Sequence, residues 1–130
     1  MKRLITVAVL ACAFVLAAEA TAAGSPLTGQ FQTVISGKTS ALNGTWVMDF
    51  APNGFYTVAK KPNLNTVLVG GSSTISGKNL MLADHQGRLA CKTPAEYTFS
   101  LSGKTVRFTK VNDSCAGRLA LLAASWTKVS

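Results

Sequence analysis

From Gly44 onward, apolar and polar side chains alternate with a period of two, and this alternation limits the possible folds more than any other feature. The clearest alternating runs contain Tyr97, Phe99 and Leu101, then Val106 and Phe108. An extended strand points successive side chains to opposite faces, so these runs predict strands with one buried apolar face. The pattern therefore predicts an all-β fold.

Turn-forming Gly, Pro, Asn and Asp residues divide this region into many short strands. The predicted strands cover residues 45–50, 55–59, 66–69, 73–75, 80–83, 88–91, 97–101, 105–109, 119–122 and 126–129. Many short strands separated by turns indicate either a sandwich or a barrel. Residues 112–117 lack the alternation, and a single short helical turn is predicted there.

The N-terminus has the features of a signal peptide. Lys2 and Arg3 precede an apolar stretch over residues 4–18, and Ala20-Thr21-Ala22 fits the cleavage pattern of small residues. The stretch is about fifteen residues long, whereas a membrane-spanning helix needs roughly twenty. We expect cleavage near Ala22, a periplasmic or secreted bacterial protein, and no transmembrane segment after signal removal. Cys12 suggests a lipoprotein as the alternative, which is disfavoured because the apolar stretch continues beyond it.

Cleavage after residue 22 would leave 108 of the 130 residues, enough for one domain with one core. Residues 23–42 are rich in Gly, Ser and Thr and predict a flexible N-terminal arm, in which Phe31, Val34 and Ile35 are available to pack against one end of the domain. The pattern leaves a short strand or a turn of helix open in this segment, and neither is assigned. The β domain itself is predicted over residues 43–130.

The remaining chain would carry 11 basic and 4 acidic side chains, a net charge of about +7. A basic balance can attract nucleic acid, anionic lipid or acidic ligands. Here the basic residues are scattered along the chain, and the one adjacent pair of lysines is Lys60-Lys61. The pattern indicates solvated strand faces and turns, and no nucleic-acid partner is expected.

Two cysteines, Cys91 and Cys115, remain after signal removal. In an oxidising compartment a small even number of cysteines predicts disulfides, and two thiols allow only one pairing within the chain. A metal pair is a weak alternative, because a single histidine adds too few ligands for zinc. We therefore expect a Cys91–Cys115 disulfide, no metal and no cofactor.

Few residues are suited to catalysis. His85 lies in the sequence Asp84-His85-Gln86-Gly87, a composition typical of a turn rather than of a histidine held in a cleft. The four carboxylates of the remaining chain show no suggestive spacing, and phosphate-loop, CxxC and HExxH motifs are absent from the sequence. We expect that the protein is not an enzyme.

Gly44-Thr45-Trp46 at the first predicted strand, with Arg118 late in the chain, resembles the lipocalin (calycin) signature. The ordered set also resembles small exported bacterial lipocalin-like domains. It comprises Gly44, Trp46, Phe50, Gly54, Tyr56, Asp84, Gly87, Cys91, Tyr97, Gly103, Phe108, Asp113, Cys115, Arg118 and Trp126. The resemblance implies an antiparallel up-and-down barrel of about eight strands.

In that superfamily the tryptophan plugs the closed end of the barrel, and an arginine from a late strand packs across its ring. The resemblance thus assigns barrel closure to Gly44, Trp46 and Arg118, through an apolar seal and a cation–π contact. It also implies a binding module for a small apolar or amphipathic ligand. Shared parity with Trp46, or an apolar face, marks as cavity lining Met48, Phe50, Tyr97, Phe99, Leu101 and Phe108.

A second resemblance leads to a different function. Small exported bacterial metalloprotease inhibitors also use a compact barrel, one disulfide and a Gly-x-Trp start, and they insert an N-terminal arm into the protease. Residues 23–42 would take that role here, although the cysteine positions depart from that family. Biotin binding is disfavoured because Trp126 is the only other tryptophan. A barrel interior of several hundred cubic ångströms would favour ligand binding.

Overall fold

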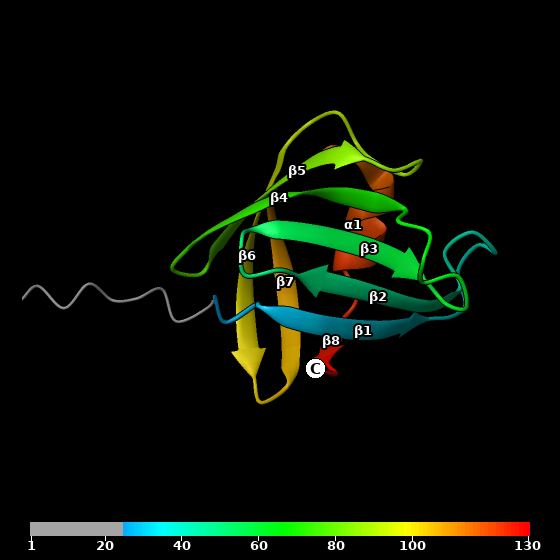
Figure 1. Cartoon of the computed structure of the whole chain (residues 1–130), viewed down its shortest axis with the longest axis horizontal. Coiled ribbons are helices and arrows are strands. Elements are labelled where there is room, and N and C mark those ends of the chain that lie inside the picture. The colour runs from blue at the N-terminus through cyan, green and yellow to red at the C-terminus, as the bar shows by residue number, and fades with distance from the viewer. Residues whose placement is uncertain (1–24) are drawn as a thin grey trace, which may run out of the picture.

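The computed structural model describes residues 25–130, which form a closed barrel of eight antiparallel strands with one short helix (Figure 1). In chain order the elements are β1 (Gly29–Ile35), β2 (Gly44–Phe50), β3 (Phe55–Lys60), β4 (Val69–Ser76), β5 (Asn79–Gln86), β6 (Ala95–Ser102), β7 (Thr105–Asn112), α1 (Ala116–Leu122) and β8 (Trp126–Lys128). Each strand pairs with its sequence neighbour, and β8 closes the barrel against β1. The predicted all-β barrel with one short helix is confirmed.

The alternation of the sequence explains which side chains fill the interior. Along β6, Ala95, Tyr97 and Phe99 are buried while the residues between them are more exposed. The same period places Trp46, Met48 and Phe50 of β2 in the core. Antiparallel strands with one buried face thus build a single hydrophobic core, as the pattern predicts.

The prediction of a flexible arm over residues 23–42 is wrong for Gly29–Ile35, which form strand β1. Phe31, Thr33 and Ile35 point inward with a period of two, and Phe31 is fully buried. Thr33 Oγ1 donates a hydrogen bond of 2.7 Å to the Ser125 carbonyl, which satisfies the polar group inside. The strand was not predicted because the segment as a whole is rich in polar residues, although two of its three buried positions are apolar. The barrel therefore starts well before residue 43.

Three predicted strands differ in the structure. Residues 66–69 and 88–91 lie mainly in loops, and residues 119–122 belong to α1. The predicted helical turn at 112–117 lies too early, since β7 extends to Asn112 and the helix starts at Ala116. A short apolar run fits a strand or a helix equally well, and here the buried residues Arg118, Leu121 and Leu122 have helical spacing.

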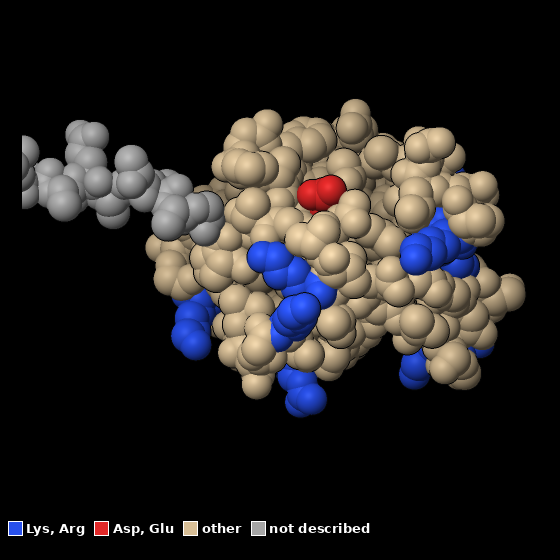
Figure 2. All heavy atoms as spheres, turned by 60° about the horizontal axis from the view of Figure 1, so that its bottom comes forward, with Lys and Arg blue, Asp and Glu red and all other residues tan. Residues whose placement is uncertain are grey.

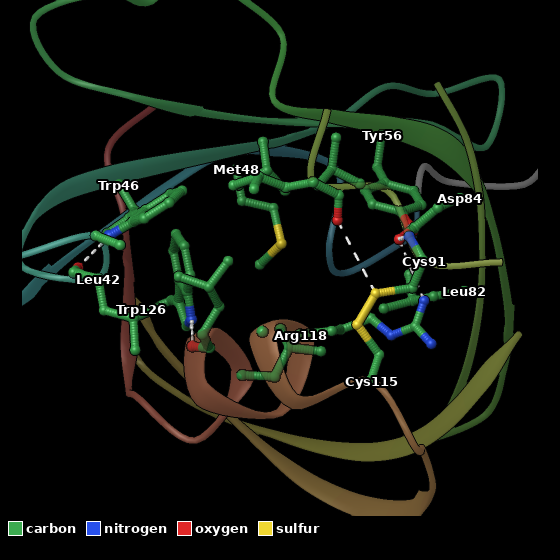
Figure 3. A pocket seen from close by; sticks show the side chains of 17 residues that line it. Leu42, Trp46, Met48, Tyr56, Leu82, Asp84, Cys91, Cys115, Arg118 and Trp126 are labelled. Carbon is green, nitrogen blue, oxygen red and sulfur yellow. Dashed lines mark hydrogen bonds and ion pairs between the residues drawn. A yellow bond between two sulfur atoms is a disulfide. The ribbon is translucent and has the colours of Figure 1, made fainter. Parts of the chain in front are cut away.

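Helix α1 carries the chain from β7 to β8 and lies across the barrel interior from Met48 and Tyr56 (Figure 3). It is tied to the last strand by Trp126 Nε1, which donates a 3.1 Å hydrogen bond to the Leu121 carbonyl. None of the helices within residues 25–130 is long and apolar enough to cross a bilayer. The predicted signal peptide, Cys12 and the Ala22 cleavage site lie outside the described residues.

Charged side chains are dispersed over the surface. On the face shown in Figure 2, lysines and arginines form several separate groups rather than one continuous stripe. This matches their scattered positions in the sequence.

Candidate functional site

The main cavity of the barrel has a volume of about 320 Å³ and lies between α1 and strands β2 to β5 (Figure 3). Most of its wall is apolar. The buried apolar or aromatic lining comprises Trp46, Met48, Tyr56, Val58, Val69, Leu82, Leu121, Leu122 and Trp126. The charged residues Asp84 and Arg118 and the two cysteines form a polar end of the cavity. The site is thus an apolar chamber with one polar end.

Of the six residues predicted to line a cavity, Met48 alone does so. Phe50, Tyr97 and Phe99 are buried in the packed part of the core, where Phe50 contacts Phe31 edge-to-face at 6.2 Å between ring centroids. Phe108 is half-buried, and Leu101 is 38% exposed near the β6–β7 turn. Parity identifies the inward face of a strand, but it does not tell which part of the interior is filled.

Trp46 closes the opposite end of the cavity from Arg118 (Figure 3). Its Nε1 donates a 2.8 Å hydrogen bond to the Leu42 carbonyl, and the Lys60 Nζ lies 5.3 Å from its ring centroid. The cation over the ring is thus Lys60, and the predicted Arg118 contact is wrong. Trp46 pairs directly with Lys60 across β2 and β3, which places that cation beside the ring.

Gly44 makes the contact between Lys60 and Trp46 possible because it has no side chain that would collide with Lys60. It adopts φ +134°, and a Cβ at this position would approach the Lys60 Cε to 2.6 Å. The glycine therefore leaves room for the Lys60 stem that crosses Trp46. The Gly-x-Trp spacing has a physical reason here, although its cationic partner differs from the predicted one.

Arg118 lies at the polar end, on α1, in a paired arrangement with Asp113. Its Nε and Nη2 each donate a 2.9 Å hydrogen bond to one Asp113 oxygen, and Nη2 also donates to the Thr93 carbonyl at 2.7 Å. Asp113 further accepts hydrogen bonds from the Tyr97 hydroxyl and from the Cys115 backbone N–H. This buried carboxylate therefore joins β6, β7 and α1, because a two-pronged arginine pair fixes both position and orientation.

Burial and these hydrogen bonds shift the pKa values of three groups. Burial raises the pKa of Tyr97 above its ordinary value of 10.0, and its hydrogen bond to Asp113 adds to the rise. Burial opposes ionisation of Asp113, but hydrogen bonds from Arg118, Tyr97 and Cys115 outweigh it and hold its pKa below the ordinary value. Burial also opposes the charge on Arg118, yet Asp113 keeps the pKa of the guanidinium raised.

Asp84 is the second carboxylate of the polar end, with its side chain almost fully buried. It accepts hydrogen bonds from the Tyr56 hydroxyl and from the Cys91 backbone N–H, the latter at 2.9 Å. Its Oδ2 lies 3.3 Å from the Arg118 Nη1. Sequence reasoning placed Asp84 in a turn and missed this role. The signal was present, since Asp84 precedes Cys91 and Asp113 precedes Cys115 in the ordered pattern.

The predicted Cys91–Cys115 disulfide is present, with the two Cα atoms 6.2 Å apart (Figure 3). It links the β5–β6 connection to the residue that caps α1, and both cysteines line the cavity. The disulfide therefore holds α1 against the loop beside the polar end.

His85 lies in β5 rather than in the predicted turn, and it is exposed. Its Nε2 is 3.0 Å from the Ser72 Oγ across the β4–β5 pair. Within residues 25–130, no three His, Cys, Asp or Glu side chains are grouped so that they could hold a metal ion.

Comparison of the chain with protein-family models, curated proteins and solved structures found no significant match.

Proposed function

We propose that the barrel is a binding module for one small, mostly apolar molecule held in the cavity between α1 and β2 to β5. The observation that carries this proposal is the chamber of about 320 Å³ with its largely apolar wall. Ligand cavities range from about 300 to 1,000 Å³. At about 30 Å³ per water-sized atom, this one holds a molecule of roughly ten non-hydrogen atoms.

The energetics of the core support an occupant. A void in a packed interior costs stability, because the lining atoms lose dispersion contacts on one side. An apolar ligand restores those contacts and leaves water on entry. Around the cavity, the disulfide, the Arg118–Asp113 pair and the hydrogen-bonded Trp46 and Trp126 rings hold the wall in place. A preformed wall reduces the ordering cost of binding.

Tryptophan fluorescence tests this proposal without a label, because the chain has two tryptophans and both line the cavity. Titration of the purified protein with n-hexane and with p-xylene is expected to change the emission saturably, with one ligand per chain. Val58→Phe, which fills part of the cavity, is expected to remove that response.

Val34→Phe, on the exposed face of β1, is the matched control and is expected to keep it. A folded wild-type protein that shows no saturable response to either compound would contradict the proposal.

We propose further that the protein acts outside the cytoplasm as a lipocalin-like, non-enzymatic barrel, after removal of residues 1–22. The disulfide supports export, because disulfides persist mainly in oxidising compartments. Mass spectrometry of the exported protein is expected to find residue 23 at its N-terminus. A chain retained in the cytoplasm with residues 1–22 attached would contradict this.

The alternative, a protease inhibitor acting through residues 23–42, loses much of its basis. Seven residues of that segment form β1, which is paired on both sides with β2 and β8. A strand inside the barrel wall cannot enter a protease cleft without opening the barrel. We therefore do not propose inhibition.

A further inference from the structure

The cavity reaches the surface at one end of the barrel. Most residues that line it are buried, and the exposed ones are Ala41, Leu89 and Gly117. These belong to the β1–β2 connection, the β5–β6 connection and the first turn of α1. Alternate connections of an up-and-down barrel lie at the same end, so the β3–β4 connection joins them. We call this the loop end of the barrel, and its connections are residues 36–43, 61–68, 87–94 and 113–115.

Folding gathers basic side chains at the loop end. The first three of its connections contain four basic residues and no acidic one. Lys60, the last residue of β3, lines a small surface hollow together with Lys61 and Arg88. The four basic residues of the connections are exposed, and they are Lys38, Lys61, Arg88 and Lys92. On the face shown in Figure 2, basic but no acidic side chains are visible at the right-hand end, where Figure 1 places the β1–β2 and β3–β4 connections.

The acidic residues near the loop end do not cancel this charge. The side chains of Asp84 and Asp113 are almost fully buried, and both are paired with Arg118. Glu96 is half-buried and lies in β6, on the wall of the barrel. The exposed charge of the loop-end connections is therefore positive, and it complements an anionic surface.

Exposed aliphatic side chains lie among these basic residues. Leu64 and Val67 in the β3–β4 connection are 44% and 37% exposed, and Leu89 is 45% exposed. The Leu89 backbone N–H donates a 3.0 Å hydrogen bond to the Leu68 carbonyl, which places Leu89 beside that connection. The turns at the opposite end, residues 51–54, 77–78 and 103–104, contain no leucine, valine or aromatic residue.

Charge alone would suit any polyanion, but aliphatic side chains at the same place favour a bilayer. A bilayer offers both parts of the match, because cationic side chains attract its anionic head groups and apolar side chains enter the boundary with the acyl chains. An acidic protein or a nucleic acid would match the charge and leave the exposed leucines in water.

We propose that the loop end docks on an anionic lipid bilayer, with Lys61 and Arg88 at the lipid phosphates and Leu64 and Leu89 in the interface. In this orientation the opening of the cavity faces the lipid, so an apolar molecule passes between the two without crossing water. The inference goes beyond the proposed function, because docking does not require an occupied cavity.

Cosedimentation of the purified protein with lipid vesicles tests the role of charge. The wild type is expected to bind vesicles of equal parts phosphatidylglycerol and phosphatidylcholine, more weakly as salt is added, and not to bind phosphatidylcholine alone. Lys61→Gln/Arg88→Gln is expected to bind the mixed vesicles about twentyfold more weakly, since each basic side chain near an anionic surface contributes about fivefold. Lys78→Gln/Lys104→Gln is the matched control, because it removes the same charge from exposed turns at the opposite end. It is expected to stay within about threefold of the wild type.

A second pair of variants tests the apolar contact. Leu64→Gln is expected to weaken binding to the mixed vesicles about fivefold, because a leucine side chain no longer leaves water. Met81→Gln is the control, since Met81 is also 44% exposed but lies in β5 on the barrel wall, and it is expected to bind as the wild type does. Urea unfolding checks that each variant is folded.

Three outcomes would overturn the docking proposal. They are a folded wild type that does not bind the mixed vesicles, equal losses in the two charge variants, and unchanged binding by Leu64→Gln. The last would favour an acidic protein as the partner. None of Lys61, Arg88 and Leu64 lines the cavity, so n-hexane binding is measured independently. Vesicle binding without a response to n-hexane or p-xylene would contradict the proposed function alone.

Discussion

Asp113 shows how much of this barrel depends on single polar side chains. It is buried, pairs with Arg118 through two hydrogen bonds, and accepts two more from Tyr97 and Cys115. A buried ion pair adds little net stability compared with apolar packing, but the removal of one partner leaves the other charge uncompensated. The function of the pair here is to fix where α1 lies, and with it the wall of the cavity.

Asp113→Asn is therefore expected to destabilise the protein by about 3–5 kcal/mol, because the Arg118 guanidinium would stay buried with only Asp84 as a carboxylate partner. Urea unfolding at neutral pH measures the change. Asp49→Asn is the control, since Asp49 makes no ion pair within residues 25–130, and a change below about 0.5 kcal/mol is expected. Equal effects of the two substitutions would refute this role for the ion pair.

Because of Tyr97, we expect the free energy of unfolding to decrease as the pH rises above 10.0. The pKa of Tyr97 is raised in the folded state, so the folded protein retains a proton that the unfolded chain loses above the ordinary pKa of 10.0. The contribution of Tyr97 is complete below pH 10.0 and declines as pH rises further, by up to about 1.4 kcal/mol per pH unit.

Comparison of wild type with Tyr97→Phe, from about pH 8 to about pH 11, isolates this effect, because other titrating groups are common to both. The variant is expected to be less stable by about 1–3 kcal/mol at the lower end of this pH range, since Asp113 loses a donor. Its unfolding free energy should decline less steeply above pH 10. Parallel curves for the two proteins would show that the phenol does not titrate as we expect.

At the scale of elements, strands with a clear alternation of apolar and polar residues were predicted well, whereas the polar strand β1 and the apolar run 119–122 were not. The alternation through Tyr97 and Phe99 is a direct consequence of a sheet with one buried face, so it identifies β6 from local sequence. The run Leu119-Ala120-Leu121-Leu122 has no alternation to read. In the structure this run is helical and buries Leu121 and Leu122 against the barrel, a tertiary environment that local patterns do not contain.

The disulfide joins two of these less predictable segments, the β5–β6 connection and the start of α1. Cys91 and Cys115 are 24 positions apart, and the entropy of closing such a loop corresponds to about 3.5 kcal/mol. We expect a Cys91→Ala/Cys115→Ala double variant to lose stability of this order in denaturant unfolding.

Reductant should lower the stability of the wild type by a similar amount and leave the double variant unchanged. A wild type that is insensitive to reductant in the unfolding transition would show that the disulfide contributes little.

At the scale of the whole molecule, the eight-stranded barrel could be predicted from the sequence, but its closing strand β1 and the location of the cavity could not. Trp46 was correctly expected in the core, yet its cationic neighbour is Lys60, set by the register of β2 and β3. The cavity lies beside α1, while the side of the interior around Phe31 and Phe50 is packed. Which part of the interior is packed and which is empty depends on where α1 lies in the barrel. The position of α1 follows from the complete topology and not from the alternation within one strand.

Closure by β1 gives the sharpest test of the whole architecture, because the same residues were expected to form a flexible arm. Phe31→Ala is expected to cost about 3–5 kcal/mol, since the ring is fully buried between β2 and β8 and packs against Phe50. Val34→Ala lies on the same strand but is 67% exposed, and it should cost less than about 1 kcal/mol. In a flexible arm outside the barrel, both substitutions would leave the unfolding free energy unchanged. A large difference between Phe31→Ala and Val34→Ala therefore requires β1 in the barrel wall, and two small effects would restore the arm and the inhibitor hypothesis with it.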